Sequence, residues 1–171
     1  MKIQNQLKKM AYFVLLASSL SVIYSAPASA GDEKTIAATS CTALTGSVIR
    51  DDRGRIFNAS TTAAANVLCP LVRDNVVAAP LSIKAVVIDN SSLLLGDGDI
   101  TCSARSMSQS GNSVINGATV GTSGTNSNGT ILTLTPVTEL DRGAYVVVCK
   151  IPRKGVGDPN SGIASITIDE P

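Results

Sequence analysis

The segment Tyr145-Val146-Val147-Val148-Cys149-Lys150-Ile151 is the part of the sequence that indicates the fold most directly. It is rich in β-branched residues, which favour strands. Because successive side chains of a strand point to opposite faces, Cys149 shares a face with Tyr145, Val147 and Ile151. The segment therefore predicts a strand whose cysteine points into an apolar core.

A second segment, Asp99-Ile100-Thr101-Cys102-Ser103-Ala104, places its cysteine on a face with two apolar neighbours. Two inward cysteines on predicted strands favour a Cys102–Cys149 disulfide, which leaves Cys41 to pair with Cys69. Four cysteines without a C-x-x-C spacing are typical of structural disulfides in exported proteins. We expect each bridge to add about 3.5 to 4 kcal/mol by restricting the unfolded chain.

Similar short runs recur along the chain between clusters of Gly, Asn, Asp, Ser and Pro. Together they predict eight strands, at 45–50, 55–60, 65–71, 81–89, 99–107, 130–135, 144–151 and 163–169. A further small hairpin is predicted at Ser113–Val120, with a type I′ turn at Asn116-Gly117. This pattern predicts an all-β fold, an antiparallel β-sandwich with two disulfides, with a closed barrel as the alternative.

Residues 1–30 have the three regions of a signal peptide. Lys2, Lys8 and Lys9 precede a mostly apolar run at 10–24, and Ala28-Ser29-Ala30 matches a cleavage site. The run is shorter than the roughly 20 residues of a membrane-spanning helix. We expect cleavage and export to the periplasm or the medium, with no membrane insertion afterwards. Residues 31–40 are expected to form a flexible lead-in, and 41–171 a single β-sandwich domain.

Composition excludes several classes of function. The chain has 14 Lys and Arg against 13 Asp and Glu, and without residues 1–30 its net charge is −2, which gives no basis for binding nucleic acid. Histidine is absent, which excludes Ser-His-Asp and Cys-His catalysis and zinc sites built on histidine. After residue 30 the only aromatic residues are Phe57 and Tyr145, too few for a stacking platform of several exposed rings.

One short segment concentrates charge around a glycine. Its charged residues are Arg50, Asp51, Asp52, Arg53 and Arg55. They could clamp an anionic ligand or supply the paired carboxylates of a glycosidase. They are also typical of a hairpin turn whose tip is 52–54 and whose charges are solvated or paired, and we favour this interpretation. The segment is our candidate binding loop, and the Gly-, Ser-, Asn- and Thr-rich stretch at 108–128 is a second candidate surface.

Three aspartates raise the question of calcium. Asp89, Asp97 and Asp99 lie close in sequence, but they lack the regular ligand spacing of an EF-hand. Asp and Gly also form ordinary turns. We expect no metal and no cofactor.

The order of these features resembles a group of small, exported, uncharacterised bacterial β-sandwich proteins with disulfides. The pattern comprises Cys41, Asn58-Ala59-Ser60, Val67-Leu68-Cys69-Pro70, Val86-Val87-Ile88-Asp89, Ile100-Thr101-Cys102 and Val147-Val148-Cys149-Lys150-Ile151-Pro152. Chaperone–usher pilus subunits and spore-coat-U-like proteins are a more distant likeness. Unlike those subunits, this chain lacks a terminal aromatic in 166–171 and an alternating donor strand in 35–39. The resemblance implies an exported sandwich and no particular activity.

These observations predict an exported, non-catalytic structural or interaction module of the cell envelope or extracellular space, with no catalytic residues. Its partner would be an unknown protein or surface ligand. One alternative is a surface fibre or coat subunit that self-associates through an exposed edge strand. Another is a hydrolase that uses carboxylates or a metal, although no catalytic constellation is recognisable. An inhibitor of an extracellular protease is a further alternative, since a rigid disulfide scaffold suits that role.

Overall fold

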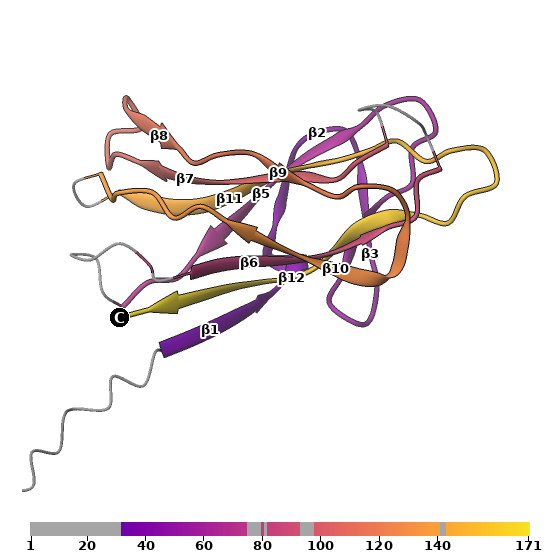
Figure 1. Cartoon of the computed structure of the whole chain (residues 1–171). Helices are drawn as coiled ribbons and strands as arrows, with labels where there is room; N and C mark the ends of the chain where they lie inside the picture. Colours follow the sequence, from indigo (N-terminus) through magenta and orange to yellow (C-terminus); the bar gives the residue numbers. More distant parts are fainter. Residues whose placement is uncertain (1–31, 75–79, 81, 93–97, 141–142) are drawn as a thin grey trace, which may run out of the picture. The chain divides into compact units, whose positions relative to one another are not determined.

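The computed structural model describes residues 32–74, 80, 82–92, 98–140 and 143–171. The unit that begins at residue 31 is compact and consists of β-strands packed in two layers (Figure 1). The elements in chain order are β1 (Asp32–Ala37), the 3₁₀ turn η1 (Ala38–Ser40), β2 (Thr42–Thr45), β3 (Val48–Arg50), β4 (Ile56–Asn58), β5 (Ala65–Leu71), β6 (Ser82–Asp89), β7 (Thr101–Met107), β8 (Val114–Asn116), β9 (Val120–Gly121), β10 (Asn126–Leu134), β11 (Ala144–Ile151) and β12 (Ser161–Glu170).

Both layers are antiparallel sheets, so the predicted β-sandwich is confirmed. The first sheet has the order β10-β6-β12-β4-β3, and β1 also pairs with β12. The second sheet has the order β2-β5-β11-β7-β8, and β9 also pairs with β7. None of the described residues forms a helix with the length and apolarity of a membrane span.

Alternating apolar side chains from both sheets build the core. In β6 the inward residues Ile83, Ala85 and Val87 are fully buried, and in β11 the inward residues include Val147 and Ile151. This is the two-residue period expected of strands with one buried face. The core therefore lies between the sheets, and the outward faces carry the polar and half-buried residues.

The disulfides have the pairing that strand phase favours. Cys102 lies directly opposite Cys149 on neighbouring strands of the second sheet, and the two are bonded. Cys41, just before β2, is bonded to Cys69 in β5. All four cysteines are buried within the core cluster.

Two predicted elements were wrong in detail. The single strand expected at 45–50 is two strands, because the chain leaves the second sheet after β2 and enters the first sheet at β3. The hairpin expected at Ser113–Val120 does not form, because β8 and β9 each pair with β7. A glycine is needed at position 117 because the backbone there lies close to two other segments. Its N–H donates to Ala104 O (2.8 Å), and an added Cβ would lie 2.7 Å from Thr135 O.

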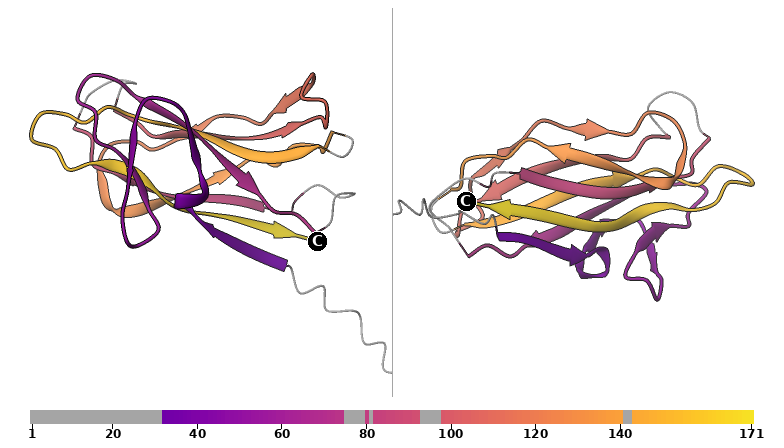
Figure 2. Two further views of the ribbon diagram at one scale, coloured as in Figure 1. Left: turned by 180° about the vertical axis from the view of Figure 1, so that it is seen from behind. Right: turned by 60° about the horizontal axis from the view of Figure 1, so that its bottom comes forward.

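The lead-in expected at 31–40 is part of the sandwich. All six residues of β1 pair with β12, as the adjacent strands in Figure 2 show. Ile36 packs against the core, and Ala38 in η1 is fully buried. The prediction of a flexible lead-in failed because this segment is stabilised by a partner strand more than 100 residues away in the sequence.

Candidate functional site

The charged segment at 50–55 forms the predicted hairpin turn between β3 and β4. Asp51 organises the turn, because its Oδ1 accepts hydrogen bonds from the backbone N–H groups of Arg53 (3.1 Å) and Arg55 (2.9 Å). Its Oδ2 forms an ion pair with the Arg55 guanidinium at 2.5 Å. These bonds hold the pKa of the Asp51 carboxyl below its usual range, with the Arg55 side chain as the largest cause.

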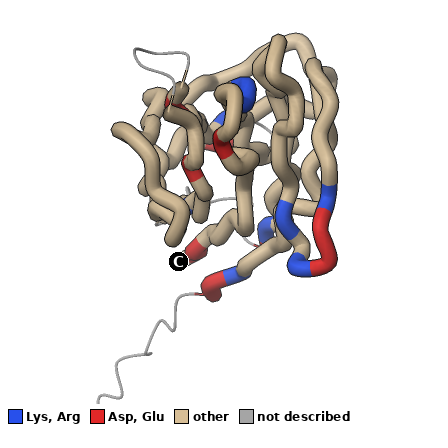
Figure 3. Tube along the Cα trace, turned by 90° about the vertical axis from the view of Figure 1, so that its right-hand side faces the viewer, with Lys and Arg blue, Asp and Glu red and all other residues tan. Residues whose placement is uncertain are grey.

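The remaining charges of this turn point to different surroundings. Arg50 donates to the backbone carbonyls of Cys41 (3.0 Å) and Thr39 (3.4 Å), which ties the hairpin to η1. Asp52 and Arg53 are exposed at the tip. In Figure 3 the turn is the loop on the right that carries both charge colours. The structure therefore joins Asp51 to Arg55 and does not gather the five residues into one cluster.

Removing the Arg55 side chain tests this arrangement. Arg55→Ala is expected to raise the pKa of Asp51 toward its usual value, because the favourable partner of the carboxylate is lost. Since the pKa in the folded protein is lowered, the interaction stabilises the fold above the unfolded pKa and is lost as the pH falls through the folded pKa. Carboxyl NMR titration measures the change. Arg53→Ala keeps its backbone N–H and serves as the control, and equal Asp51 pKa values in the two variants would contradict the assignment.

Of the three aspartates considered for calcium, the structure describes Asp89 and Asp99, and Asp99 is half-buried just before β7. Asp89 is buried, and its carboxylate accepts hydrogen bonds from the N–H groups of Ser91 (3.1 Å) and Ile100 (3.3 Å) and from the hydroxyls of Ser161 (3.3 Å) and Thr122. Asp97 lies outside the described residues. Among the residues that the structure describes, no group of three potential metal ligands occurs. Asp89 thus joins the ends of several strands inside the sandwich.

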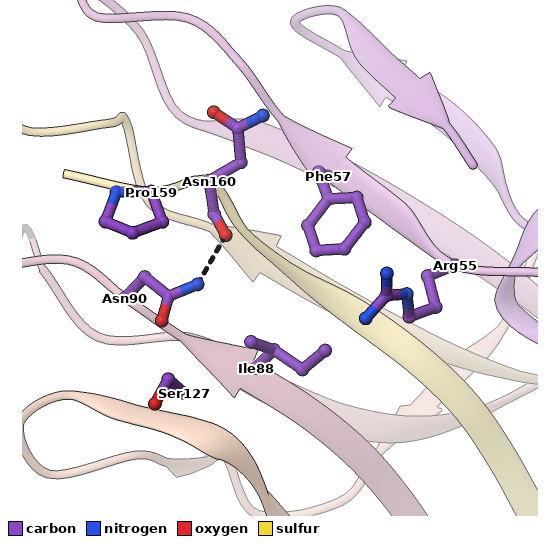
Figure 4. A pocket seen from close by; sticks show the side chains of 7 residues that line it. All are labelled: Arg55, Phe57, Ile88, Asn90, Ser127, Pro159 and Asn160. Carbon is purple, nitrogen blue, oxygen red and sulfur yellow. Dashed lines mark hydrogen bonds between the residues drawn. The ribbon is translucent and has the colours of Figure 1, made fainter. Parts of the chain in front are cut away.

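The most distinctive surface feature is a pocket of about 310 Å³ on the outward face of the first sheet (Figure 4). Its lining residues are Arg55, Phe57, Ile88, Asn90, Ser127, Pro159 and Asn160. They come from β4, β6, β10 and the segments next to β4, β6 and β12. Each of the two surfaces named from the sequence contributes one residue: Arg55 from the charged turn and Ser127 from the 108–128 stretch.

The ring of Phe57 is half-buried in this pocket, and a glycine beside it makes room for it. Gly162 of β12 pairs with Phe57 on one side and with Ile88 on the other. A Cβ at Gly162 would lie 2.5 Å from Phe57 Cδ1 and 2.0 Å from Ile56 O, closer than atoms can approach. The absence of a side chain lets the ring lie across the sheet. Phe57 is half-buried, whereas Tyr145 is only 4% exposed, so Phe57 is the surface ring of the described chain.

Polar groups line the pocket around the ring. The Arg55 guanidinium lies 5.1 Å from the ring centroid of Phe57, in a cation–π contact. Asn90 Nδ2 donates to the Asn160 carbonyl (2.8 Å), which fixes one side of the pocket. The side-chain oxygen of Asn160 is buried and has no hydrogen-bond partner among the described residues. The pocket thus combines one aromatic face with amide, hydroxyl and guanidinium groups.

Sequence reasoning missed a buried ion-pair cluster between the two layers. Arg73 follows β5 and pairs with Glu139 and with Glu170 of β12 (Nε–Oε1 2.9 Å), and Lys34 of β1 pairs with Glu170 (Nζ–Oε2 2.9 Å). The side chains of Arg73, Glu139 and Glu170 are 4%, 9% and 1% exposed. The guanidinium of Arg73 also lies 5.2 Å from the Tyr145 ring. Glu139 and Glu170 lie 66 and 97 residues from Arg73 in the sequence, so no local pattern reveals these pairs.

The comparisons with known proteins assign no family. No protein-family model matches the sequence, and no curated protein matches it. Among solved structures, a xylan-binding module, CBM15, is 17% identical, with a TM-score of 0.47 over 82% of this chain and 97% of that one. A family two carbohydrate esterase from Cellvibrio japonicus is 11% identical, with a TM-score of 0.43 over 82% of this chain, which spans about a third (34%) of the esterase. Neither likeness assigns this chain a ligand or an activity.

Proposed function

We propose that this protein is an exported, non-catalytic binding module and that its site is the Phe57 pocket, which takes a unit of a neutral carbohydrate. The observation that carries the proposal is the half-exposed ring of Phe57 among amide and hydroxyl groups. A sugar has one apolar face of C–H groups and a rim of hydroxyls. An aromatic ring beside fixed polar groups matches both parts of that chemistry.

The charges around the pocket favour a neutral ligand. Arg55 is the charged residue among the described lining residues, and its guanidinium is paired with the carboxylate of Asp51. An anionic ligand would have to compete with that carboxylate at 2.5 Å. Asn90, Asn160 and Ser127 offer neutral donors and acceptors, which suit hydroxyl groups.

The count of aromatic residues argued against a platform of several rings, and the proposal therefore rests on a single ring. Gly162 lies between Phe57 and Ile88 and has no side chain, so the ring of Phe57 and the side chain of Ile88 line the same pocket. One ring supports contact with one sugar unit, so we expect weak binding that is specific for a short segment of the ligand.

Export is supported by the disulfides. Both bridges are buried, and disulfides of this kind persist in oxidising compartments outside the cytoplasm. A module in that location meets the polysaccharides of cell surfaces and of the medium, and the proposed ligand is of this class.

Loss of the ring should abolish the proposed binding. In a titration with the neutral oligosaccharide that binds best in a glycan array, Phe57→Ala is expected to weaken binding at least about tenfold, since a central aromatic contact is removed. Leu44→Ala is the matched control, because Leu44 is a 53% exposed apolar residue in β2 of the other sheet. It should bind as the unmodified protein does.

Two results would contradict the proposal. One is an array in which no neutral glycan is bound. The other is a bound glycan whose affinity is the same in Phe57→Ala as in Leu44→Ala, which would place the ligand elsewhere on the molecule. Thermal unfolding of both variants confirms that they are folded before binding is compared.

A further inference from the structure

A second surface pocket, of about 280 Å³, differs in chemistry from the Phe57 pocket. Lys150, near the end of β11, and Arg153, three residues further on, form one part of its lining. Thr62 and Ala64, in the segment that leads into β5, form the other part. None of the described residues that line it is acidic.

The two cations of this pocket have no carboxylate partner in the part of the chain that the structure describes. Some other cations of the described chain do have carboxylate partners, as the ion pairs Lys34–Glu170, Arg55–Asp51 and Lys84–Glu33 show. Lys150 and Arg153 form no ion pair and no side-chain hydrogen bond with a described residue. Two unpaired positive charges that line one pocket make its electrostatic potential positive, and a positive potential attracts an anion.

Buried hydrogen bonds hold the two parts of the pocket together. Asn58 is fully buried, and its Nδ2 donates to Ala63 O (2.9 Å) and to Pro152 O (3.0 Å). Its Oδ1 accepts from the N–H of Ser60 (2.9 Å), and Lys154 N–H donates to Ser60 O (2.7 Å). The segment before β5 is therefore fixed against the segment after β11, so the pocket is built before any ligand arrives.

We propose that this pocket binds a phosphate group, with Lys150 and Arg153 as its charge partners and the Thr62 hydroxyl as an additional donor. A phosphate monoester carries nearly two negative charges at neutral pH, which matches two cations. The guanidinium fork of Arg153 fits two phosphate oxygens, and the ammonium of Lys150 contributes a point charge. The site is independent of the Phe57 pocket.

The test is a titration of the full chain with inorganic phosphate, followed through backbone amide NMR signals. We expect saturable shifts at Thr62, Ala64, Lys150 and Arg153, and none with sodium chloride of equal ionic strength. The double variant Lys150→Ala/Arg153→Ala should bind phosphate at least about tenfold more weakly. The control, Arg53→Ala/Lys84→Ala, removes the same charge from other surfaces and should change the affinity less than about twofold.

A second experiment distinguishes a phosphate on a lipid headgroup from a phosphate on a soluble molecule. Cosedimentation with vesicles that contain phosphatidic acid, when it is lost in the Lys150/Arg153 variant alone, assigns the site to a lipid headgroup. Saturable inorganic phosphate binding without cosedimentation assigns it to a soluble phosphate. The proposal is overturned if neither probe binds, or if both double variants lose binding equally, which would show that only net charge matters.

Discussion

Replacing Arg73 with alanine is expected to lower the free energy of unfolding by about 3 to 5 kcal/mol. The Arg73 side chain is 4% exposed and lies against Glu139 and Glu170, which are themselves buried. Removal of the guanidinium would leave two carboxylates in a dry interior with less positive charge to offset them. The cost of leaving these carboxylates buried without their partner exceeds the net stabilisation that the intact ion pairs provide. The carboxylates have already lost their contact with water in the folded protein, and the attraction of Arg73 offsets that loss.

Urea denaturation with intact disulfides measures this effect. Arg53→Ala is the matched control, since Arg53 is exposed at the β3–β4 turn and its loss should cost less than about 0.5 kcal/mol. A loss of less than about 1 kcal/mol in Arg73→Ala would show that water or a rearranged Lys34 compensates the carboxylates. The cluster would then not hold the ends of β1 and β12 to the rest of the sandwich.

Removing the Cys102–Cys149 bridge, by replacing both cysteines with alanine, is expected to lower the free energy of unfolding by about 4 kcal/mol. The bridge closes a loop with a sequence separation of 47, and the entropy of an unclosed loop grows with its length. The Cys41–Cys69 bridge has a separation of 28, so the matching alanine pair should lose slightly less, about 3.5 kcal/mol.

Equilibrium unfolding of the two double-alanine variants and of the unmodified protein checks this prediction. Alanine keeps these buried positions apolar, so the comparison isolates the crosslink from any cost of burying a polar group. Variants as stable as the unmodified protein would show that the bridges do not stabilise this fold. A much larger loss from the shorter loop would contradict the loop-length explanation.

The sequence predicted best the strands whose own pattern of apolar residues shows which face is buried. The predicted bounds of β5 and β11 match the structure. β5 has the alternation of a strand with one buried face, and β11 is a β-branched run between Gly143 and Pro152, residue types that interrupt strands. The phase of Cys102 and Cys149 followed from the same alternation. In these cases the local pattern is sufficient.

Other elements depend on partners that are distant in the sequence. β1 contains Asp32, Glu33 and Lys34 and has no strand signal of its own, yet it pairs along its whole length with β12. The Phe57 pocket likewise requires the register of β4, β12 and β6, which places Gly162 between Phe57 and Ile88. Composition identified Phe57 as one of two aromatic residues after residue 30, but only the folded arrangement of these strands shows that its half-buried ring lines a pocket.

The measurement that tests the proposed site most directly is NMR of the protein labelled with ¹³C only in phenylalanine. The chain contains two phenylalanines, Phe13 and Phe57, and Phe57→Leu assigns the Phe57 ring signals. We predict that these signals shift in a saturable way during titration with the glycan selected from the array, because the sugar packs on that ring. Phe57 signals that stay unchanged while the glycan binds would contradict the assignment of the Phe57 pocket as the binding site.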